Sequence, residues 1–528
     1  MSAFHEALRE RNPDRPGTRR WVYVPYDQLS DRFGPLAETP PSELGIVMVE
    51  NPAKADRRPY HKQKLALVLA SGRHFALEQA ARGVAVVHRV ATGSLAATLE
   101  EVAGELGPLE VQRPAERELR AELASLFESG TLVELPHEGW LTTEDEFTAA
   151  CGDAPPWRMD SFYRAVRRRT GVLMVDGKPE GGRFSFDGEN RKPWKGEPAA
   201  PPTPTFRPDG VTTEVCEMVE EHYADHPGRL DPRTIPASKA QVRRLWSWAL
   251  SECLPLFGPF EDAMSTRSKS LFHTRISPLL NINRITAAEV LEDVLGLEGV
   301  PLSSQEGFVR QVLGWREFVR HVHEQTDGFR EIPEVGANPS VNGHAAPSFL
   351  EAHLPLPPVF WGESPSGLHC LDHTVEQVWD EGYSHHITRL MVLANWGTLL
   401  DVSPRELTDW FWAAYVDAYD WVVEPNVLAM GTFATGEVMT TKPYVSGSAY
   451  VNRMSDFCGA CAFDPKKDCP MTRLYWAFLA RNAKRLEGNQ RVSLPLRNVA
   501  KRKPAEREKD RETFESVRAA LERGERLR

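Results

Sequence analysis

The 528-residue sequence contains no apolar run long enough to cross a membrane, and residues 1–20 are charged rather than apolar. These absences exclude a membrane-spanning helix and an ordinary secretory leader. Cysteine is also scarce, with seven residues, an odd number for a framework of disulfides. Because reduced thiols are typical of intracellular proteins, we expect a cytoplasmic protein with no membrane partner.

Positive charge is not in excess, because the formal net charge is −11. A surface of that sign does not bind DNA non-specifically over its whole area. One segment nevertheless holds eight lysines and arginines between residues 481 and 503 against a single acid, Glu487. This segment predicts either a local patch for phosphate groups or a solvated face.

Residues 21–136 alternate short apolar runs with helical patterns. The runs lie at 21–25, 45–50, 84–88, 109–112 and 132–135. Strands separated by helices predict a parallel, Rossmann-like sheet in an α/β domain. No GxGxxG follows the first strand, so a dinucleotide at this sheet is not supported. A ligand of such a sheet would lie at the carboxyl ends of its strands, where Asp27, Gln28 and Glu50 occur.

The remaining chain divides into four parts by composition. Residues 1–20 form an N-terminal extension, and residues 137–235 form a connector with a proline-rich, loop-like middle. Residues 236–503 have helical periodicity and hold most of the tryptophans, which predicts an all-α second domain. Residues 504–528 are highly charged and predict a frayed amphipathic helix or tail. There is no internal repeat, and we expect a monomer.

Three cysteines lie close together in the helical half. They are Cys458, Cys461 and Cys469. Thiols at this spacing form a disulfide or converge on a soft metal, and a metal needs a fourth ligand. Cys370 is the best candidate, while Cys253 and Cys216 remain alternatives. Four thiolates fit zinc or a [4Fe–4S] cluster, and three reduced structural thiols are the other interpretation.

Four segments of the helical half place polar side chains among apolar ones. Their polar residues are Thr274, Arg275 and Ser277; Gln311 and Arg316; His385, His386 and Arg389; and Asp417, Glu424 and Asn426. Hydroxyl and amide donors before Pro278 suit a pyrophosphate, whereas acid and amide edges can bind a heterocycle. Of two adjacent histidines, one can act as a general acid near a ligand while the other packs. Each segment taken alone also fits a structural role.

Taken together, these segments resemble the photolyase/cryptochrome flavoproteins, and more narrowly their bacterial iron–sulfur branch, which includes the prokaryotic (6-4) photolyases. The resemblance extends from about residue 21 to residue 481. It rests on 61–64, 73–75, 181–191, 272–281, 311–318, 382–391 and 417–426, together with the four cysteines.

The resemblance implies an α/β antenna domain, a long connector and a helical domain that binds FAD. His273, Thr274, Arg275 and Ser277 would then approach the flavin phosphates. Around the same cofactor the resemblance implies Gln311, Arg316 and Arg389, with Asp417, Glu424 and Asn426 near the isoalloxazine ring. It also implies a [4Fe–4S] cluster on Cys370, Cys458, Cys461 and Cys469. The antenna of the branch is 6,7-dimethyl-8-ribityllumazine, which would lie near Asp27, Gln28 and Glu50.

The activity implied is light-driven DNA repair. Reduced FAD would donate an electron to a flipped pyrimidine photoproduct in damaged DNA, with a (6-4) lesion favoured over a cyclobutane dimer. His386, with His385 beside it, would face the lesion and move a proton. Electrons would return to the flavin through tryptophans, for which Trp410, Trp361 and Trp421 are the candidates. Phosphates would be bound by Arg183, Arg191 and the basic segment at 481–503.

Two departures and two alternatives accompany this interpretation. The loop between Cys461 and Cys469 is shorter than the branch has, and Tyr26 stands where the branch has glycine. One alternative is a photosensory cryptochrome with the same FAD and cluster but little or no repair. The other is a light-independent iron–sulfur protein that binds DNA, such as a nuclease or a primase-like subunit. That class has no need of the N-terminal α/β domain.

Overall fold

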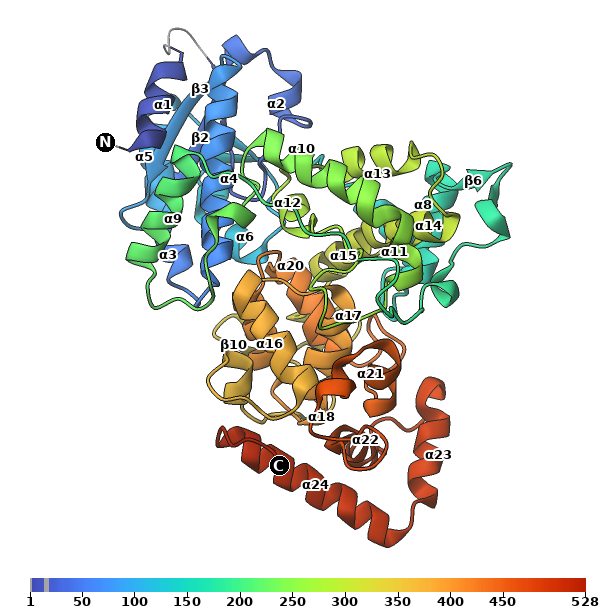
Figure 1. Cartoon of the computed structure of the whole chain (residues 1–528). Coiled ribbons are helices and arrows are strands. Elements are labelled where there is room, and N and C mark those ends of the chain that lie inside the picture. Colours follow the sequence, from blue (N-terminus) through green and yellow to red (C-terminus); the bar gives the residue numbers. More distant parts are fainter. Residues whose placement is uncertain (1, 14–18) are drawn as a thin grey trace.

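The computed structural model describes residues 2–13 and 19–528, and its N-terminal part is built on one parallel sheet (Figure 1). The strand order is β3-β2-β1-β4-β5. The strands are β1 (Arg20–Tyr23), β2 (Leu44–Glu50), β3 (Ala85–Val90), β4 (Leu109–Gln112) and β5 (Leu132–Leu135). The five strands fall where the apolar runs predict them, and the α/β fold class of this part is confirmed.

Helices cover both faces of the sheet because its side chains alternate between two cores. Ile46 faces a core shared with α4 (Lys62–Ala81), and its neighbour Val47 faces a second core with α5 (Leu95–Leu106) and α6 (Arg117–Glu128). Two short helices, α2 (Pro35–Glu38) and α3 (Pro52–Ala55), follow the first two strands. Ser94 caps α5 through a hydrogen bond to Ala97 N.

The N-terminal extension contributes a helix to this domain. In α1 (Ala3–Arg11), Ser2 is the N-cap and Phe4 is fully buried. The Asn12 side chain pairs with both backbone groups of Val86, at 2.8 Å each, on the edge strand β3. This contact protects a sheet edge that would otherwise be open. Residues 1 and 14–18 of the predicted extension lie outside the described residues.

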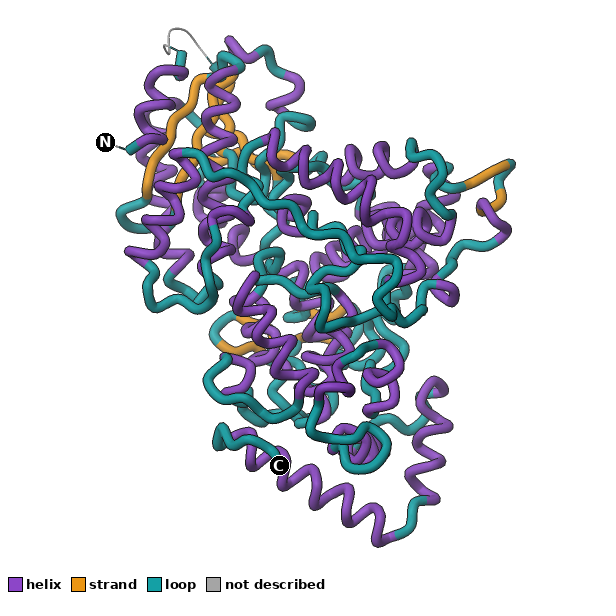
Figure 2. Tube along the Cα trace, viewed as in Figure 1, coloured by secondary structure: helices purple, strands orange, loops and turns teal. Residues whose placement is uncertain are grey.

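The connector joins the two domains by packing on both. Its α9 (Gly210–His222) lies on α4 of the N-terminal α/β domain, while α7 (Glu144–Cys151) and α8 (Met159–Thr170) lie against the helical domain. A small hairpin, β6 (Met174–Val175) and β7 (Lys178–Pro179), follows α8. The long stretch between this hairpin and α9 is loop, as Figure 2 shows.

The second domain is helical, as predicted. Its helices are α10 (Lys239–Trp248), α11 (Leu254–Phe260), α12 (Ser277–Asn281), α13 (Ala287–Leu295), α14 (Leu302–Val309), α15 (Glu317–Gln325), α16 (His369–Glu381), α17 (His386–Thr388), α18 (Asn395–Leu399), α19 (Pro404–Ala414), α20 (Asp420–Val423), α21 (Ser448–Met454) and α22 (Pro470–Arg481). Two hairpins of two-residue strands interrupt it, β8 (Glu331–Ile332) with β9 (Gly336–Ala337) and β10 (Ser340–Val341) with β11 (His344–Ala345).

The C-terminal segment differs from the frayed tail that its charge predicts. After α23 (Ser493–Lys501), residues Pro504–Glu522 form the continuous helix α24, which packs against α22 (Figure 1). Its buried stripe consists of Phe514, Val517 and Leu521, and the Arg481 guanidinium lies 3.6 Å from the Phe514 ring centre. The apolar stripe fixes the helix despite the charged residues around it. Among the described residues, no helix combines the length and apolar character needed to span a bilayer.

Candidate functional site

The helical domain encloses a cavity of about 300 Å³, within the range of small-molecule sites. Most of the polar residues singled out in this domain line it. They are His273, Thr274, Arg275, Ser277, Gln311, Arg316, His386, Arg389, Asp417 and Asn426, together with Trp421. Three π-helical turns contribute to the lining, at Arg310–Arg316, Arg389–Ala394 and Glu424–Gly431. Such turns re-aim side chains and occur frequently at functional sites.

A buried ion pair organises one wall of this cavity. Arg389 donates two parallel hydrogen bonds to the Asp417 carboxylate, at 2.9 and 3.0 Å, and the Ser277 hydroxyl donates a third at 2.6 Å. Burial would raise the pKa of Asp417, but Arg389 and Ser277 outweigh it and hold the pKa below its usual value. Asp417 is therefore an anion with its oxygens in fixed directions.

The histidines form a stacked group beside the cavity. The rings of His273 and His385 are parallel within 11°, with centres 4.5 Å apart. His386 lines the cavity, whereas His385 packs behind it and is not part of the lining. His386 is exposed in the open cavity, and desolvation by the surrounding protein, reinforced by Arg389 and Arg310, lowers its pKa to about 4. The imidazole that faces the cavity is therefore neutral at neutral pH, able to accept or donate a hydrogen bond.

Glu261 is a cavity residue that sequence reasoning missed. Its carboxylate accepts hydrogen bonds from Gln311 Nε2 at 2.7 Å and Asn190 Nδ2 at 3.2 Å. Burial raises the pKa of Glu261 to about 7, with Arg310 and Asn190 opposing the shift. A carboxyl group that titrates near neutrality can hold or release a proton at this wall. Its only sequence signal is an acid at the end of an apolar segment, 254–260.

Glu424 does not line the cavity, although the resemblance implies a place near a flavin. Its carboxylate is buried among one histidine and two arginines, His323 at 2.8 Å, Arg405 at 2.9 Å and Arg330 at 3.3 Å. Burial opposes ionisation, but His323 and the arginines lower the pKa of Glu424 to about 2. These three partners hold the Glu424 carboxylate outside the cavity, in a structural cluster.

Trp361 and Trp410, two of the three predicted tryptophans, are joined by Trp379, which sequence reasoning did not single out. Trp379 stacks on the half-buried Trp361 with ring centres 5.7 Å apart, and meets the buried Trp410 edge-on at 6.0 Å. Trp410 in turn lies 6.1 Å from Tyr415, which lines the cavity. Trp421 lies apart from this chain, in the cavity wall against Trp140 at 5.2 Å.

The four predicted metal ligands lie in one region. Cys370 is on α16, Cys458 lies in the short 3-10 helix Phe457–Ala460 with Cys461 at its C-terminal end, and Cys469 is the N-cap of α22. Burial raises the pKa of Cys370 to about 12, and the neighbouring thiols of the other three add to the shift. Within residues 2–13 and 19–528, no three His, Cys, Asp or Glu side chains are grouped closely enough to hold a metal ion. The donor set suits a soft metal, but the thiols lie farther apart than ligands do.

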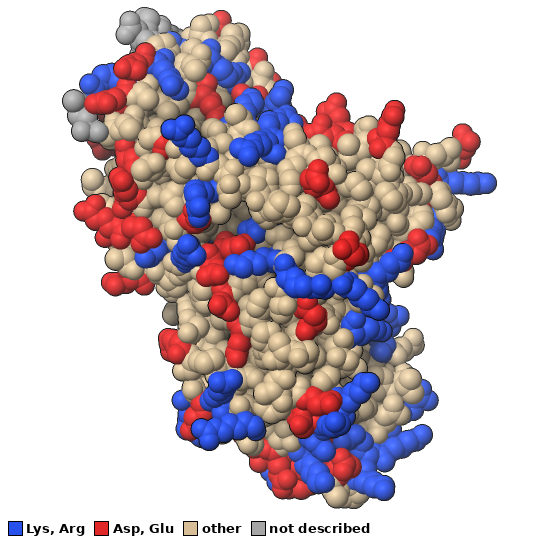
Figure 3. All heavy atoms as spheres, viewed as in Figure 1, with Lys and Arg blue, Asp and Glu red and all other residues tan. Residues whose placement is uncertain are grey.

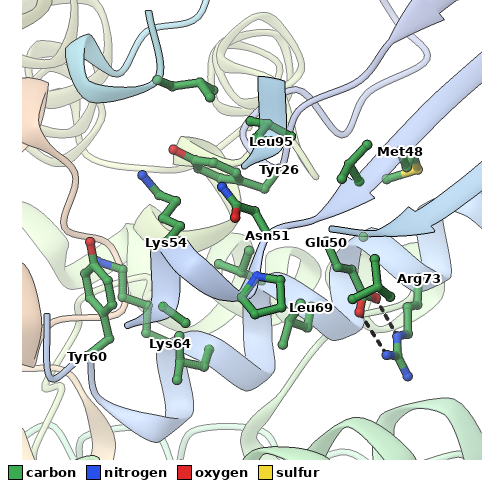
Figure 4. A pocket seen from close by; sticks show the side chains of 18 of the residues that line it. Tyr26, Met48, Glu50, Asn51, Lys54, Tyr60, Lys64, Leu69, Arg73 and Leu95 are labelled. Atoms are coloured by element: carbon green, nitrogen blue, oxygen red, sulfur yellow. Dashed lines mark hydrogen bonds and ion pairs between the residues drawn. The ribbon is translucent and has the colours of Figure 1, made fainter. Parts of the chain in front are cut away.

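A second cavity, of about 530 Å³, opens at the carboxyl ends of β1–β3 (Figure 4). At one end Arg73 holds Glu50 with hydrogen bonds of 2.7 and 3.0 Å, and His88 lies 3.2 Å from the same carboxylate. At the other end Lys54 and the Tyr26 hydroxyl both contact Glu116. Apolar side chains such as Leu69 and Leu95 lie between these polar ends.

Of the three residues predicted at this cavity, Glu50 lines it and Asp27 and Gln28 do not. The Asp27 carbonyl accepts a hydrogen bond from Asn283 at 2.7 Å, and Gln28 donates to the Gln112 carbonyl at 2.8 Å. Burial raises the pKa of Asp27 to about 6. Tyr26, the residue that departs from the expected glycine, is the one whose side chain reaches the cavity.

The basic segment at 481–503 is only partly available to a ligand. Arg481 pairs with Asp401, Arg485 with Glu351 and Arg502 with Asp510. In the part of the chain that the structure describes, Arg491, Arg497, Lys501 and Lys503 form no ion pair. Figure 3 shows lysines and arginines gathered at the lower right of the molecule, where Figure 1 places α23.

Comparisons with known proteins agree on one family. The family described as "Deoxyribodipyrimidine photo-lyase-related protein" matches residues 22–234. A (6-4) photolyase from Agrobacterium fabrum is 32% identical over 499 residues, covering 91% of this chain and 95% of the relative.

Solved structures match the same fold. A bacterial class III photolyase from Agrobacterium tumefaciens has a TM-score of 0.56 at 15% identity, covering 97% of this chain and 99% of that chain. A cryptochrome from Synechocystis has a TM-score of 0.55 at 14% identity, covering 96% and 100%.

Proposed function

Because the chain belongs to the photolyase-related branch of the photolyase/cryptochrome family, we propose that it is a blue-light-dependent DNA photolyase that uses FAD. The observation that carries the proposal is the helical-domain cavity, where residues from four separate segments of the sequence converge. A binding site explains why so many polar groups are brought together inside an apolar domain.

The donor set of the cavity fits FAD. Arg275, Arg316 and Arg389 supply cations for phosphate groups, with the Thr274 and Ser277 hydroxyls beside them. The side chains of Asp417 and Asn426 suit the polar edge of a flavin ring. Glu424 has no place in this set, because it does not line the cavity and its carboxylate contacts Arg405, Arg330 and His323 instead. When bound and reduced, FAD supplies the electron that splits a photoproduct after absorption of blue light.

The substrate proposed is damaged DNA, with a (6-4) photoproduct favoured over a cyclobutane dimer. The (6-4) photolyase relative supports that choice. A damaged base pair stacks poorly, so its extrusion toward the cavity costs only about a few kcal/mol. His386 faces the cavity and is proposed to move the proton that a (6-4) lesion needs. His385 positions it from behind, while Trp410, Trp379 and Trp361 provide a route for electrons from the surface.

Two further cofactors belong to the proposal. Cys370, Cys458, Cys461 and Cys469 are proposed to hold a [4Fe–4S] cluster. Burial raises the pKa of Cys370, Cys458 and Cys469, and a bound cation reverses that resistance to ionisation. The cavity of the sheet is proposed to hold an antenna such as 6,7-dimethyl-8-ribityllumazine between Glu50 and Tyr26. Its apolar middle and polar ends suit a flat heterocycle with a polyol chain.

A repair assay tests the proposal. The full-length protein, purified with its flavin, is mixed with oligonucleotides carrying one defined (6-4) photoproduct or one cyclobutane dimer, under blue light or in darkness. Restoration of the (6-4) oligonucleotide only in the light is the expected result. A flavin-containing protein that restores neither lesion would favour the photosensory cryptochrome. A cryptochrome structure also shares this fold.

A further inference from the structure

The two cavities share a wall, and one short segment faces both. Tyr419 and Trp412 line the cavity of the sheet, whereas Asp417 and Ala418 line the cavity of the helical domain. Tyr419 has an extended backbone, with φ −138° and ψ 163°. The neighbours Ala418 and Tyr419 therefore face different cavities.

Lys64 of the antenna domain holds this wall. Its ammonium donates to the Ala418 carbonyl at 2.6 Å and to the Trp412 carbonyl at 3.0 Å. It also lies 4.5 Å from the ring centre of Tyr60 and 5.1 Å from that of Tyr419. One side chain therefore contacts two backbone carbonyls and two aromatic rings that belong to both domains.

The same turn of the antenna domain caps the end of a helix in the other domain. Trp412 and Ala413 lie in the last turn of α19, where carbonyls have no partner within the helix. Lys64 Nζ donates a hydrogen bond to the Trp412 carbonyl, and the backbone N–H of His61 donates one to the Ala413 carbonyl at 2.8 Å.

Lys64 has no carboxylate partner at contact distance. Across residues 2–13 and 19–528, none of the ion pairs within 4.0 Å includes it, although its side chain is buried. Burial, reinforced by Lys54 and Arg58, lowers the pKa of Lys64 well below its usual value, while Asp417 on the far side of the wall opposes the shift. A buried amine whose hydrogen bonds go to two backbone carbonyls of the other domain calls for a role beyond packing.

We propose that Lys64 is a positioning residue for the flavin site: it fixes the wall segment Asp417–Tyr419 from the antenna domain and so sets the affinity for FAD. The inference rests on the proposed function, because it takes the helical-domain cavity to be the FAD site. On the cavity side, Asp417 accepts hydrogen bonds from Arg389 and Ser277. A shift of the wall segment therefore changes the positions of these two side chains in the cavity. The antenna domain then contributes to flavin binding without contacting the flavin.

The test is a double-mutant cycle on FAD affinity. Apoprotein of the full chain is titrated with FAD for the wild type, Lys64→Met, Asp417→Asn and the double variant. Lys64→Met keeps the length of the side chain and removes its charge and donors. The expected weakening is roughly 5- to 150-fold, the range of ordinary coupling between sites. In the Asp417→Asn background the same substitution is expected to have a much smaller effect.

Lys62→Met is the matched control, because Lys62 lies on the same helix and pairs with exposed Glu220 instead. It is expected to leave FAD affinity unchanged. If Lys64→Met does not fold, the FAD affinity of Lys64→Gln, which keeps an amide donor, is measured in its place and judged by the same criteria. Wild-type affinity in the Lys64 variant, or an equal loss in both backgrounds, overturns the inference. A wild-type protein that binds no FAD instead overturns the proposed function.

Discussion

The indole rings of Trp379 and Trp410 meet edge to face, with centres 6.0 Å apart, and both N–H groups donate to the Phe360 carbonyl at 2.9 Å. That shared acceptor fixes the two rings relative to each other. Trp379 also stacks on Trp361 nearer the surface, so an aromatic path leads from the cavity wall outward.

Replacing Trp379 with phenylalanine is therefore expected to slow photoreduction of the bound flavin severalfold while FAD remains bound. The reason is that the ring between Trp410 and Trp361 is lost as an electron carrier, along with one hydrogen bond worth about 1 kcal/mol. The measurement is the decay of the oxidised flavin absorption under blue light with an external reductant. Trp476→Phe, at a tryptophan on α22, is the control. Equal rates in both variants would remove Trp379 from the path.

His386→Asn is expected to abolish repair of a (6-4) oligonucleotide and to leave the flavin spectrum in place. Asparagine keeps a polar side chain at the cavity but cannot move a proton near neutral pH. Loss of general acid–base catalysis lowers rates by about 10²–10⁴-fold. Exposed His353 offers a control substitution to asparagine. Repair by the His386 variant at the parent rate would exclude the role proposed for it.

Much of the fold could be predicted because its signals are local. Apolar runs such as 45–50 are short and bounded, and Ser94 and Thr286 are recognisable helix caps. The C-terminal helix α24 was harder to predict, since only three of its apolar residues are buried. Where charge dominates composition, the burial of a few apolar residues still decides the structure.

The candidate site could be predicted in part, for a physical reason that Glu424 and Glu261 illustrate. Both are acids of the helical half, yet Glu424 is drawn away by Arg405, Arg330 and His323, which are distant in sequence. Glu261 is brought to the cavity wall by Gln311. Such partners follow from the tertiary structure and leave no spacing signal. Trp379 was missed because ring stacking across α16 and α19 likewise has no sequence pattern.

The apoprotein is expected to lose stability as pH falls from about 6.5 toward 4. Desolvation by the surrounding protein, with Arg389 and Arg310 nearby, depresses the pKa of His386 to about 4 in the folded state. The unfolded chain, with an ordinary histidine pKa near 6.5, therefore takes up the proton first, and stability present above that pH is lost below it. Because the His386 side chain is exposed in the open cavity, solvent screening keeps this loss smaller than the full pKa shift implies. Urea unfolding at pH 7.5 and 5 should show a smaller loss in His386→Asn, and identical losses would contradict this assignment.

Removal of one proposed cluster ligand is expected to remove the iron. Cys461→Ser leaves three thiolates, too few to complete a four-cysteine site. Iron and sulfide per chain, together with the broad visible absorption of the cluster, should fall in this variant under anaerobic purification. Cys151→Ser, in the connector helix α7, should retain both. Zinc in place of iron in the wild type would redirect the assignment to a structural zinc site.

Arg497 and Lys501 of α23 form no ion pair within the described residues, and we expect them to contact DNA phosphates. Arg497→Ala combined with Lys501→Ala should weaken lesion-DNA binding and reduce the slope of log affinity against log salt by about 0.9 per lost contact. Arg523→Ala, whose side chain is paired with Glu525, should change neither. An unchanged salt slope in the double variant would show that DNA binds elsewhere.

The central claim is that the helical-domain cavity holds a flavin that blue light can reduce. The most direct measurement is the absorption spectrum of the full-length protein after reconstitution with FAD and gel filtration, recorded before and after blue illumination with a reductant. The account predicts oxidised flavin bands that co-elute with the protein and fade in the light. A protein that elutes colourless after reconstitution, or whose flavin bands do not respond to light, would contradict it.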